Sequence, residues 1–376
     1  MESLRIHALT MPKWGLSMTK GQISSWLVDE GSEVGPGIEI VDIETEKVTS
    51  GLEPGQAGIL RRKTAAAGAE IPVGGLIGIV ADPSVTDTEI ESFVAEFCSR
   101  SIAIPESEQS AGPVPQQVDI GGLRLRYLAQ GAGGPSAILL HGFGGDLNNW
   151  LFNHGELAGN RVVYALDIPG HGGSSRLSGI RDLSGFADAV AAFMDALNIS
   201  SAHLGGHSMG GAIALQLALT HPDRVRSLAL IASAGLGTEI DGEYIEGFIS
   251  SSRRKELKPF LDRLFANSSL VSKQLIDDVL KFKRIDGSGA YLQLIADCFW
   301  PSGRQACVLR DRLSTLRMPV LAVWGSEDRI IPATHAQGLP EHVESHIIPE
   351  SGHMVQMEAA SKLNRILQRF WSRAEN

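Results

Sequence analysis

Three side chains in the second half of the sequence could together attack a carbonyl carbon. Ser208 lies in the run GHSMG, Asp328 ends the run VLAVWGSED, and His353 lies in SGHMVQ. A serine hydroxyl becomes a strong nucleophile when a histidine removes its proton, and an acid must hold that histidine in place. The chain order Ser, Asp, His occurs in known triads of this kind. Glu327 is next to Asp328, so both carboxylates are candidates for the acid.

The glycines around Ser208 predict a sharp turn. GHSMG follows an apolar run and precedes a helical one, with Gly206 and Gly210 on either side of the serine. This spacing is typical of a nucleophile elbow, in which the serine backbone is strained and only glycines let strand and helix approach closely. The motif alone is weak, because many loops place serine among glycines. Its position between a predicted strand and a predicted helix is what supports the interpretation.

A second glycine-rich loop could stabilise a developing negative oxygen. The run HGFGGD follows the apolar run SAILL. We expect the backbone N–H groups of Phe143 and of Met209, the residue after the serine, to form an oxyanion hole together. His141 and Asp146 lie in the same loop and are expected to brace it rather than to react.

Strands alternate with helices from about residue 117 onward. Residues 183–198 and 209–222 have helical apolar spacing, and the second segment ends at a proline. Apolar parallel strands that alternate with helices predict an α/β sheet covered on both faces. We expect its strands within residues 123–129, 136–142, 161–170, 199–208, 226–234, 318–328 and 345–353.

The first eighty residues contain an internal repeat. Residues 21–43, shifted by 37 positions onto 58–80, align glycine with glycine at three places and apolar with apolar residues at two others. Each copy runs from a strand through a glycine-containing turn into a second strand. Two copies predict a small all-β sandwich or flattened barrel with an approximate twofold axis. Lys47 directly follows the first copy, so the axis places it at the end opposite the chain ends.

Lys47, in the run ETEKV, has two explanations. Taken alone, a lysine at a turn is usually a solvated surface residue. However, residues 5–82 resemble the lipoyl domain family, in which a lysine at this hairpin carries lipoate. The related biotin carriers place methionines on both sides of the lysine, whereas Glu46 and Val48 flank Lys47 here. The resemblance therefore implies covalent lipoate on Lys47 rather than biotin.

Length, charge and composition limit the organisation and the partners. The 376 residues are expected to form two domains, 1–82 and 119–376, joined by a linker at 83–118 in which 86–98 has helical spacing. The formal net charge of −10 argues against nucleic acid or an anionic membrane as partner. Three widely spaced cysteines favour neither a disulfide framework nor a metal site. We find no secretory segment and no membrane span, so a cytoplasmic location is expected.

Residues 117–374 resemble the α/β-hydrolase family. Besides GHSMG, the run DIPGHGGSS at 167–175 is similar to one of its recurrent loops. In that family the acid directly precedes a turn like RIIP, which favours Asp328 over the neighbouring glutamate. The family also inserts a helical cap at a place that corresponds to about residues 235–315.

Two basic runs and two aromatic residues of this cap have alternative explanations. Residues 253–258 and 281–284 could attract the phosphates of coenzyme A, or they could be solvated helix faces. Phe299 and Trp300 could line an acyl pocket, or they could fill the core of the cap.

The order of the two domains resembles the dihydrolipoamide acetyltransferase components of bacterial acetoin dehydrogenase complexes. This resemblance covers nearly the whole chain. It implies transfer of an acyl group, acetyl in this family, from a lipoyl-lysine thioester to coenzyme A at a Ser-His-Asp site. It also implies a thiamine-diphosphate-dependent acetoin dehydrogenase component that loads the lipoyl arm, and a dihydrolipoamide dehydrogenase that reoxidises it. No metal is implied.

Two other functions stay open from the sequence. The protein could be a lipoyl-linked thioesterase or ester hydrolase, because water and a thiol can remove an acyl group from the same serine. It could also be a lipoyl carrier with a non-catalytic hydrolase-fold scaffold. The chain lacks the His-x-x-x-Asp-Gly motif of the usual 2-oxoacid acyltransferase core and a recognisable subunit-binding domain. The oligomeric state, including a homo-oligomer, and the docking of partner enzymes are therefore left open.

We expect the protein from a lipoylating host to carry one lipoyl group on Lys47, because the repeat places this lysine at a tight hairpin. Intact-mass measurement with peptide mapping checks this, and Lys47→Arg should remove the adduct. An unmodified Lys47 in such a host would contradict the lipoyl assignment and would leave only a hydrolase.

Overall fold

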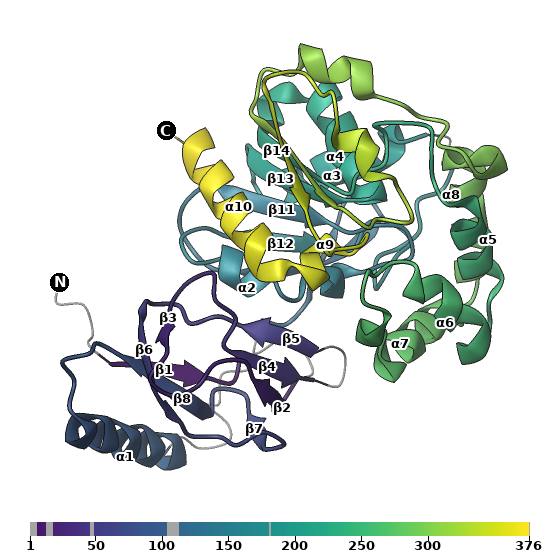
Figure 1. The fold of residues 1–376 in the computed structure, drawn as a ribbon. Coiled ribbons are helices and arrows are strands. Elements are labelled where there is room, and N and C mark those ends of the chain that lie inside the picture. The colour runs from purple at the N-terminus through teal and green to yellow at the C-terminus, as the bar shows by residue number, and fades with distance from the viewer. Residues whose placement is uncertain (1–5, 13–17, 46–48, 104–112, 180–181, 376) are drawn as a thin grey trace. The chain divides into compact units, whose positions relative to one another are not determined.

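The chain forms two compact units, residues 1–114 and 115–376, in the computed structural model (Figure 1). The structure describes residues 6–12, 18–45, 49–103, 113–179 and 182–375. Within these residues, no helix is long and apolar enough to cross a membrane.

Two four-stranded antiparallel sheets build the first unit. The first sheet has the order β1 (Ile6–Thr10), β8 (Leu76–Ala81), β6 (Gly58–Lys63), β3 (Glu33–Val34). The second has the order β5 (Thr49–Leu52), β4 (Val41–Glu44), β2 (Lys20–Trp26), β7 (Glu70–Pro72). Both sheets contribute to one apolar core, in which Ile23, Ile43 and Leu60 are fully buried. The predicted all-β fold of residues 1–82 is confirmed.

The predicted repeat is visible in the hydrogen bonds between the two copies. The Gly31 N–H donates to the Leu60 carbonyl at 2.7 Å, and the Gly68 N–H donates to the Ile23 carbonyl at 2.7 Å. Donors and acceptors in these two bonds are related by the same shift of 37 positions. Gly31 and Gly68 both have a positive φ, of 93° and 85°, which a residue with a side chain rarely adopts. The two copies therefore form equivalent turns.

Strands β4 and β5 form the hairpin predicted to carry the lysine. They pair antiparallel from Val41 opposite Leu52 to Glu44 opposite Thr49, so residues 45–48 connect them. Lys47 itself lies outside the described residues. The fully buried Ile43 anchors the strand that leads toward it.

Helix α1 (Asp87–Ala103) belongs to the first unit, packs against its strand β8 and extends the helix predicted at 86–98. The Thr86 hydroxyl and the Glu89 carboxylate cap its first turn reciprocally. Ile90 is buried in a small core formed with strand β8. Arg61 donates to the Asp87 carboxylate at 2.8 Å. Much of the segment predicted as linker is therefore ordered helix.

An eight-stranded sheet forms the centre of the second unit. Its order is β16 (Val343–Ile348), β15 (Val320–Gly325), β14 (Val225–Ile231), β13 (Ala202–His207), β11 (Ser136–Leu140), β12 (Val163–Leu166), β10 (Arg124–Gln130), β9 (Gln116–Asp119). The strands from β12 to β16 run parallel, and β10 is antiparallel to both neighbours. All seven predicted strands are present. The edge strand β9 was not predicted, and it begins inside the predicted linker. Its sequence QQVD has no apolar run that would indicate a strand.

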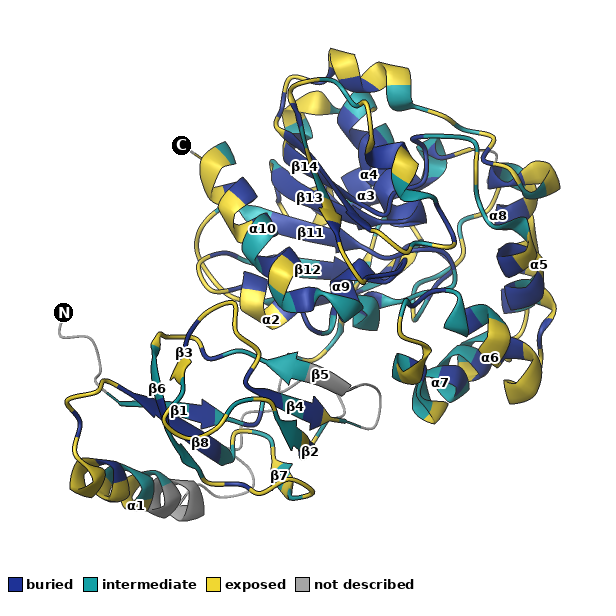
Figure 2. Ribbon diagram, in the orientation of Figure 1, coloured by how far each residue is buried: buried dark blue, intermediate teal, exposed yellow. Residues whose placement is uncertain are grey.

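Helices cover both faces of this sheet, as predicted. On one face α3 (Ser184–Ala196) packs on α4 (Met209–Thr220), and on the other α2 (His154–Leu157) packs on α10 (Ala360–Ala374) (Figure 1). Helix α9 (Val355–Glu358) directly precedes α10. Short 3-10 helices are η1 (Leu147–Trp150), η2 (Pro222–Arg224), η3 (Ser268–Leu270), η4 (Pro301–Gly303), η5 (Arg310–Thr315) and η6 (Ala333–Ala336). Figure 2 shows the parallel strands as the most buried part of the unit.

Four helices between β14 and β15 form the predicted cap. They are α5 (Gly242–Ser250), α6 (Arg254–Asp262), α7 (Lys273–Lys283) and α8 (Ser288–Phe299). Each buries an apolar stripe and exposes a polar one (Figure 2). The cap thus lies between the strand that follows the serine helix and the strand that precedes Asp328.

Candidate active site

Ser208 occupies the turn between strand β13 and helix α4 in a strained backbone conformation, with φ 53° and ψ −119°. A Cβ on Gly206 would lie 2.4 Å from the Gly210 carbonyl oxygen, and a Cβ on Gly210 would lie 2.4 Å from the Leu140 carbonyl oxygen. Only glycine fits at either position. The structure therefore has the close strand-to-helix approach that the GHSMG spacing predicts.

The structure brings His353 and Asp328 together. The Nδ1 of His353 lies 2.8 Å from the Oδ2 of Asp328, and both side chains are buried. The other oxygen of Asp328 accepts the N–H groups of Ile330 and Ile331 at 2.8 and 2.9 Å. Because an ionised carboxylate only accepts, the Nδ1 that faces it carries a proton, which leaves Nε2 as the nitrogen that can exchange a proton with the serine. Glu327, the competing acid, is exposed.

Ser208 and His353 line the same pocket, which contains about 630 Å³ of space including its open mouth. Its wall is mostly apolar. The residues that form it come from the cap and from the loops around the eight-stranded sheet. The side chains from cap helices α5, α6 and α7 are Tyr244, Ile245, Phe248, Leu261, Leu275 and Val279. These residues were not predicted, because periodicity shows which face of a helix is apolar and does not show what that face contacts.

The loop after strand β11 lies against the serine. A Cβ on Gly142 would lie 3.0 Å from the Ser208 Cβ, and Phe143 lines the pocket. The Phe143 N–H donates to no other described residue. Met209 is the first residue of α4, so its N–H has no acceptor within the helix. Of the two predicted oxyanion donors, Phe143 lines the pocket and Met209 directly follows Ser208 at the start of α4.

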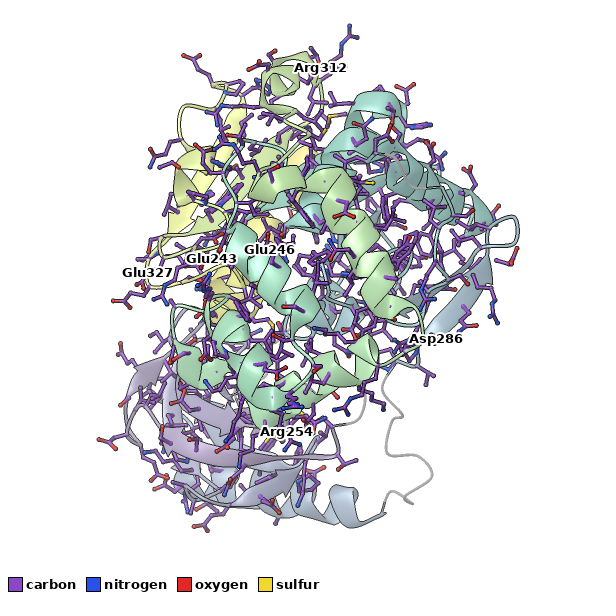
Figure 3. All side chains as sticks on the ribbon, turned by 90° about the vertical axis from the view of Figure 1, so that its right-hand side faces the viewer. Glu243, Glu246, Arg254, Asp286, Arg312 and Glu327 are labelled. Carbon is purple, nitrogen blue, oxygen red and sulfur yellow. The ribbon has the colours of Figure 1, made fainter. Side chains whose placement is uncertain are left out.

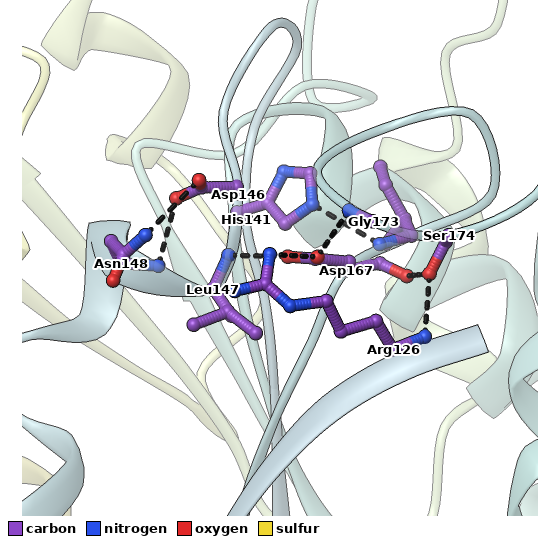
Figure 4. A network of polar contacts seen from close by, with 9 residues as sticks. Arg126, His141, Asp146, Leu147, Asn148, Asp167, Gly173 and Ser174 are labelled. Carbon is purple, nitrogen blue, oxygen red and sulfur yellow. Dashed lines mark hydrogen bonds and ion pairs between the residues drawn. The ribbon is translucent and has the colours of Figure 1, made fainter. Parts of the chain in front are cut away.

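A buried carboxylate holds this loop from behind (Figure 4). One oxygen of Asp167 accepts the Leu147 N–H at 2.7 Å, and the other accepts the Gly173 N–H at 2.8 Å and Arg126 at 3.0 Å. Burial, followed by the charge of Asp146, raises the pKa of Asp167 to about 7. Asp146 also caps helix η1, as expected for a bracing residue.

Two buried histidines brace the site in their neutral form. His141 accepts the Ile168 N–H at its Nε2 and contacts the Gly142 carbonyl through Nδ1 at 2.8 Å, and burial lowers its pKa to about 4. His207 contacts the His353 carbonyl through Nε2 at 3.0 Å. Burial, assisted by His353, lowers the pKa of His207 well below its ordinary value. His207 therefore holds the backbone of the residue predicted as the base.

Four of the seven basic side chains in the two runs 253–258 and 281–284 have acidic or carbonyl partners among the described residues. Arg254 binds Asp277 between α6 and α7, and Lys258 binds Asp262 within α6. Figure 3 shows Arg254 on the outer surface of the cap. Lys283 donates to the Phe248 and Ser251 carbonyls, and burial lowers its pKa to about 8. These contacts fit structural roles better than a phosphate site.

Phe299 and Trp300, at the end of α8, have different surroundings. Trp300 lines the pocket and meets the Phe143 ring edge-on at 5.0 Å. Phe299 packs on Phe186 of helix α3 at 5.7 Å. Trp300 therefore lines the pocket, whereas Phe299 packs against helix α3 outside the cap. No cluster of His, Cys, Asp and Glu that could hold a metal exists within the described part of the chain.

Both units of the chain are similar to known protein families. A family model described as alpha/beta hydrolase fold matches residues 135–360, and one described as biotin-requiring enzyme matches residues 7–80. The dihydrolipoyllysine-residue acetyltransferase component of the acetoin cleaving system of Pseudomonas putida is 46% identical over 367 residues, which cover 97% of this chain and 98% of that protein. The Cupriavidus necator component with the same name is 44% identical over 365 residues, 97% of both chains.

A solved structure supports the fold of the second unit. A meta-cleavage product hydrolase from Pseudomonas fluorescens covers 69% of this chain and 98% of its own, with a TM-score of 0.63 and 24% identity. At this identity the likeness is evidence for the fold alone.

The close packing at the elbow predicts opposite effects for two glycine substitutions. Gly210→Ala should lower the free energy of unfolding of the second unit by about 1–3 kcal/mol, because the added Cβ meets backbone. Gly289→Ala is the matched control in helix α8. Nothing lies within 4 Å of its added Cβ, so it should raise the same free energy by about 0.4–1 kcal/mol. Denaturant unfolding measures both, and equal effects would contradict the close approach.

Proposed function

Because the chain belongs to the family of dihydrolipoyllysine-residue acetyltransferase components of acetoin cleaving systems, we propose that it transfers an acetyl group from lipoyl-Lys47 to coenzyme A through Ser208. One observation carries the proposal. A lipoyl-type module and a pocket lined by Ser208 and a buried, acid-oriented His353 occur in a single chain.

The residues around the hairpin fit a covalent lipoate. The β4–β5 register leaves four residues, 45–48, to connect the strands, and Lys47 is the lysine among them. The relatives are named for lipoyllysine, which supports lipoate over biotin. Lipoate on Lys47 would present the acetyl group as a thioester. The module supplies the rigid strands on either side of the attachment point.

The site residues can then perform acyl transfer in two steps. His353 Nε2 takes the proton of Ser208 while the serine oxygen bonds to the thioester carbon, and the N–H groups of Phe143 and Met209 stabilise the oxyanion. The carbon–sulfur bond breaks, and His353 returns the proton to the leaving thiolate. The thiol of coenzyme A then gives its proton to His353 and takes the acetyl group from Ser208. Asp328 holds the imidazole and stabilises its charged form in both steps.

Hydrolysis is the second candidate, because water could replace the thiol in the last step. The solved hydrolase structure shares the fold, and the site has no feature that by itself selects a thiol. The apolar wall of the pocket disfavours water and therefore favours transfer. A third candidate, the lipoyl carrier with an inactive hydrolase fold, is disfavoured by the intact hydrogen bond between His353 and Asp328.

The family also supports specific partners. We propose that a thiamine-diphosphate-dependent acetoin dehydrogenase component loads the lipoyl arm and that a dihydrolipoamide dehydrogenase reoxidises it. The names of the relatives place them in a multicomponent acetoin cleaving system, which is what supports these partners. A cytoplasmic location is part of the same proposal.

Ser208→Ala should lower acetyl-coenzyme A formation from S-acetyldihydrolipoamide by more than about a thousandfold, because the nucleophile is lost. The exposed Ser200→Ala is the matched control and should leave the rate unchanged. Product analysis with and without coenzyme A separates the candidates. Acetyl-coenzyme A as the main product supports transfer, and acetate in both reactions indicates a hydrolase. An unaltered rate in Ser208→Ala would remove the route through the serine.

A further inference from the structure

Glu358, at the end of helix α9, has contacts that the reaction described above does not use. One carboxylate oxygen accepts the Gly352 N–H at 2.6 Å, and the other accepts the Asn267 N–H at 3.1 Å. It forms no ion pair with any described residue. Burial raises the pKa of Glu358, while the N–H donors of Gly352, Asn267 and Ala266 act in the opposite direction. This carboxylate therefore serves backbone N–H groups alone.

The two segments that share Glu358 are far apart in sequence and both belong to the site. Gly352 is the neighbour of His353, whereas Asn267 follows cap helix α6. A Cβ on Gly352 would lie 2.6 Å from the backbone nitrogen of Ala266, so the two backbones are in direct contact. The Met354 N–H also donates to the Leu264 carbonyl at 3.1 Å.

Residues of both segments line the pocket beside the base. Leu264 and Phe265 come from the cap segment, and Met354 follows His353 directly. A movement of the cap segment would therefore change the pocket wall and the position of the imidazole together.

We propose that Glu358 is a positioning residue that fastens the His353 loop to cap segment 264–267, so that His353 is aligned with Ser208 only while this part of the cap is in place. The inference rests on the proposed function, because it assigns His353 as the base. The distances and the absence of an ion pair within the described residues favour this role over a surface charge. Each carboxylate oxygen accepts an N–H from a different segment, so the carboxylate bridges the His353 loop and the cap segment.

Glu358→Gln tests the bridge with almost no change in size. A glutamine offers one acceptor oxygen and one NH2 group, so the N–H donors at one of the two carboxylate oxygens lose their acceptor. We expect kcat for p-nitrophenyl acetate, counted per active site titrated by the burst, to fall about tenfold while KM stays within about twofold. Counting per titrated site removes the effect of any unfolded fraction.

The matched control is Glu350→Gln, which removes the same charge from an exposed residue before the same loop. It should leave kcat unchanged. Gly352→Ala is a second test that keeps the carboxylate, because its Cβ would force the cap segment and the His353 loop apart. It should lower kcat per site by a similar factor.

The outcomes separate this proposal from the proposed function. A kcat per site in Glu358→Gln equal to that of Glu350→Gln would overturn the positioning role and leave acetyl transfer standing. The expected losses with the ester, without acetyl-coenzyme A formation from the thioester, would uphold the positioning role and overturn transfer. A wild-type protein that forms no acyl-enzyme at Ser208 from the ester would overturn both.

Discussion

The close approach of two backbones at Ser208 is the constraint on which the site depends. Strand β13 must end, and helix α4 must begin, within van der Waals distance of the carbonyl that ends strand β11. This is possible only where Gly206 and Gly210 carry no Cβ, and it holds the serine at a positive φ that costs on the order of 1–3 kcal/mol. The packed parallel sheet supplies the stability that maintains this strain. In return, Ser208 lines the pocket at the start of helix α4.

The groups behind the serine share a second property, which is that buried polar side chains hold the surrounding backbone in place. Burial lowers the pKa of His141 and of His207; His141 contacts backbone groups through both ring nitrogens, and His207 does so through Nε2. Asp167 accepts the N–H of Leu147 at the end of the loop after β11, and it also binds the Gly173 N–H and Arg126. Such a rigid surrounding is what electrostatic stabilisation of a transition state requires, because the donors need not reorganise during the reaction.

Local patterns predicted much of this architecture, and long-range contacts account for what they missed. GHSMG, the apolar strands and the 37-residue repeat each lie within a short window, so both folds could be predicted from them. The choice of Asp328 over Glu327 needed a family resemblance, because two adjacent carboxylates have nearly the same sequence context. Glu358 could not be predicted, since its acceptor role joins residues 91 positions apart. Strand β9 was missed because it is a polar edge strand.

The most direct test of the account is to look for the acetyl group on the serine. The lipoylated chain is incubated with S-acetyldihydrolipoamide without coenzyme A, quenched in acid and digested for peptide mass spectrometry. The account predicts one acetyl group on Ser208, which disappears as acetyl-coenzyme A forms when coenzyme A is added before the quench. Formation of acetyl-coenzyme A with Ser208 unmodified at every time point would contradict it.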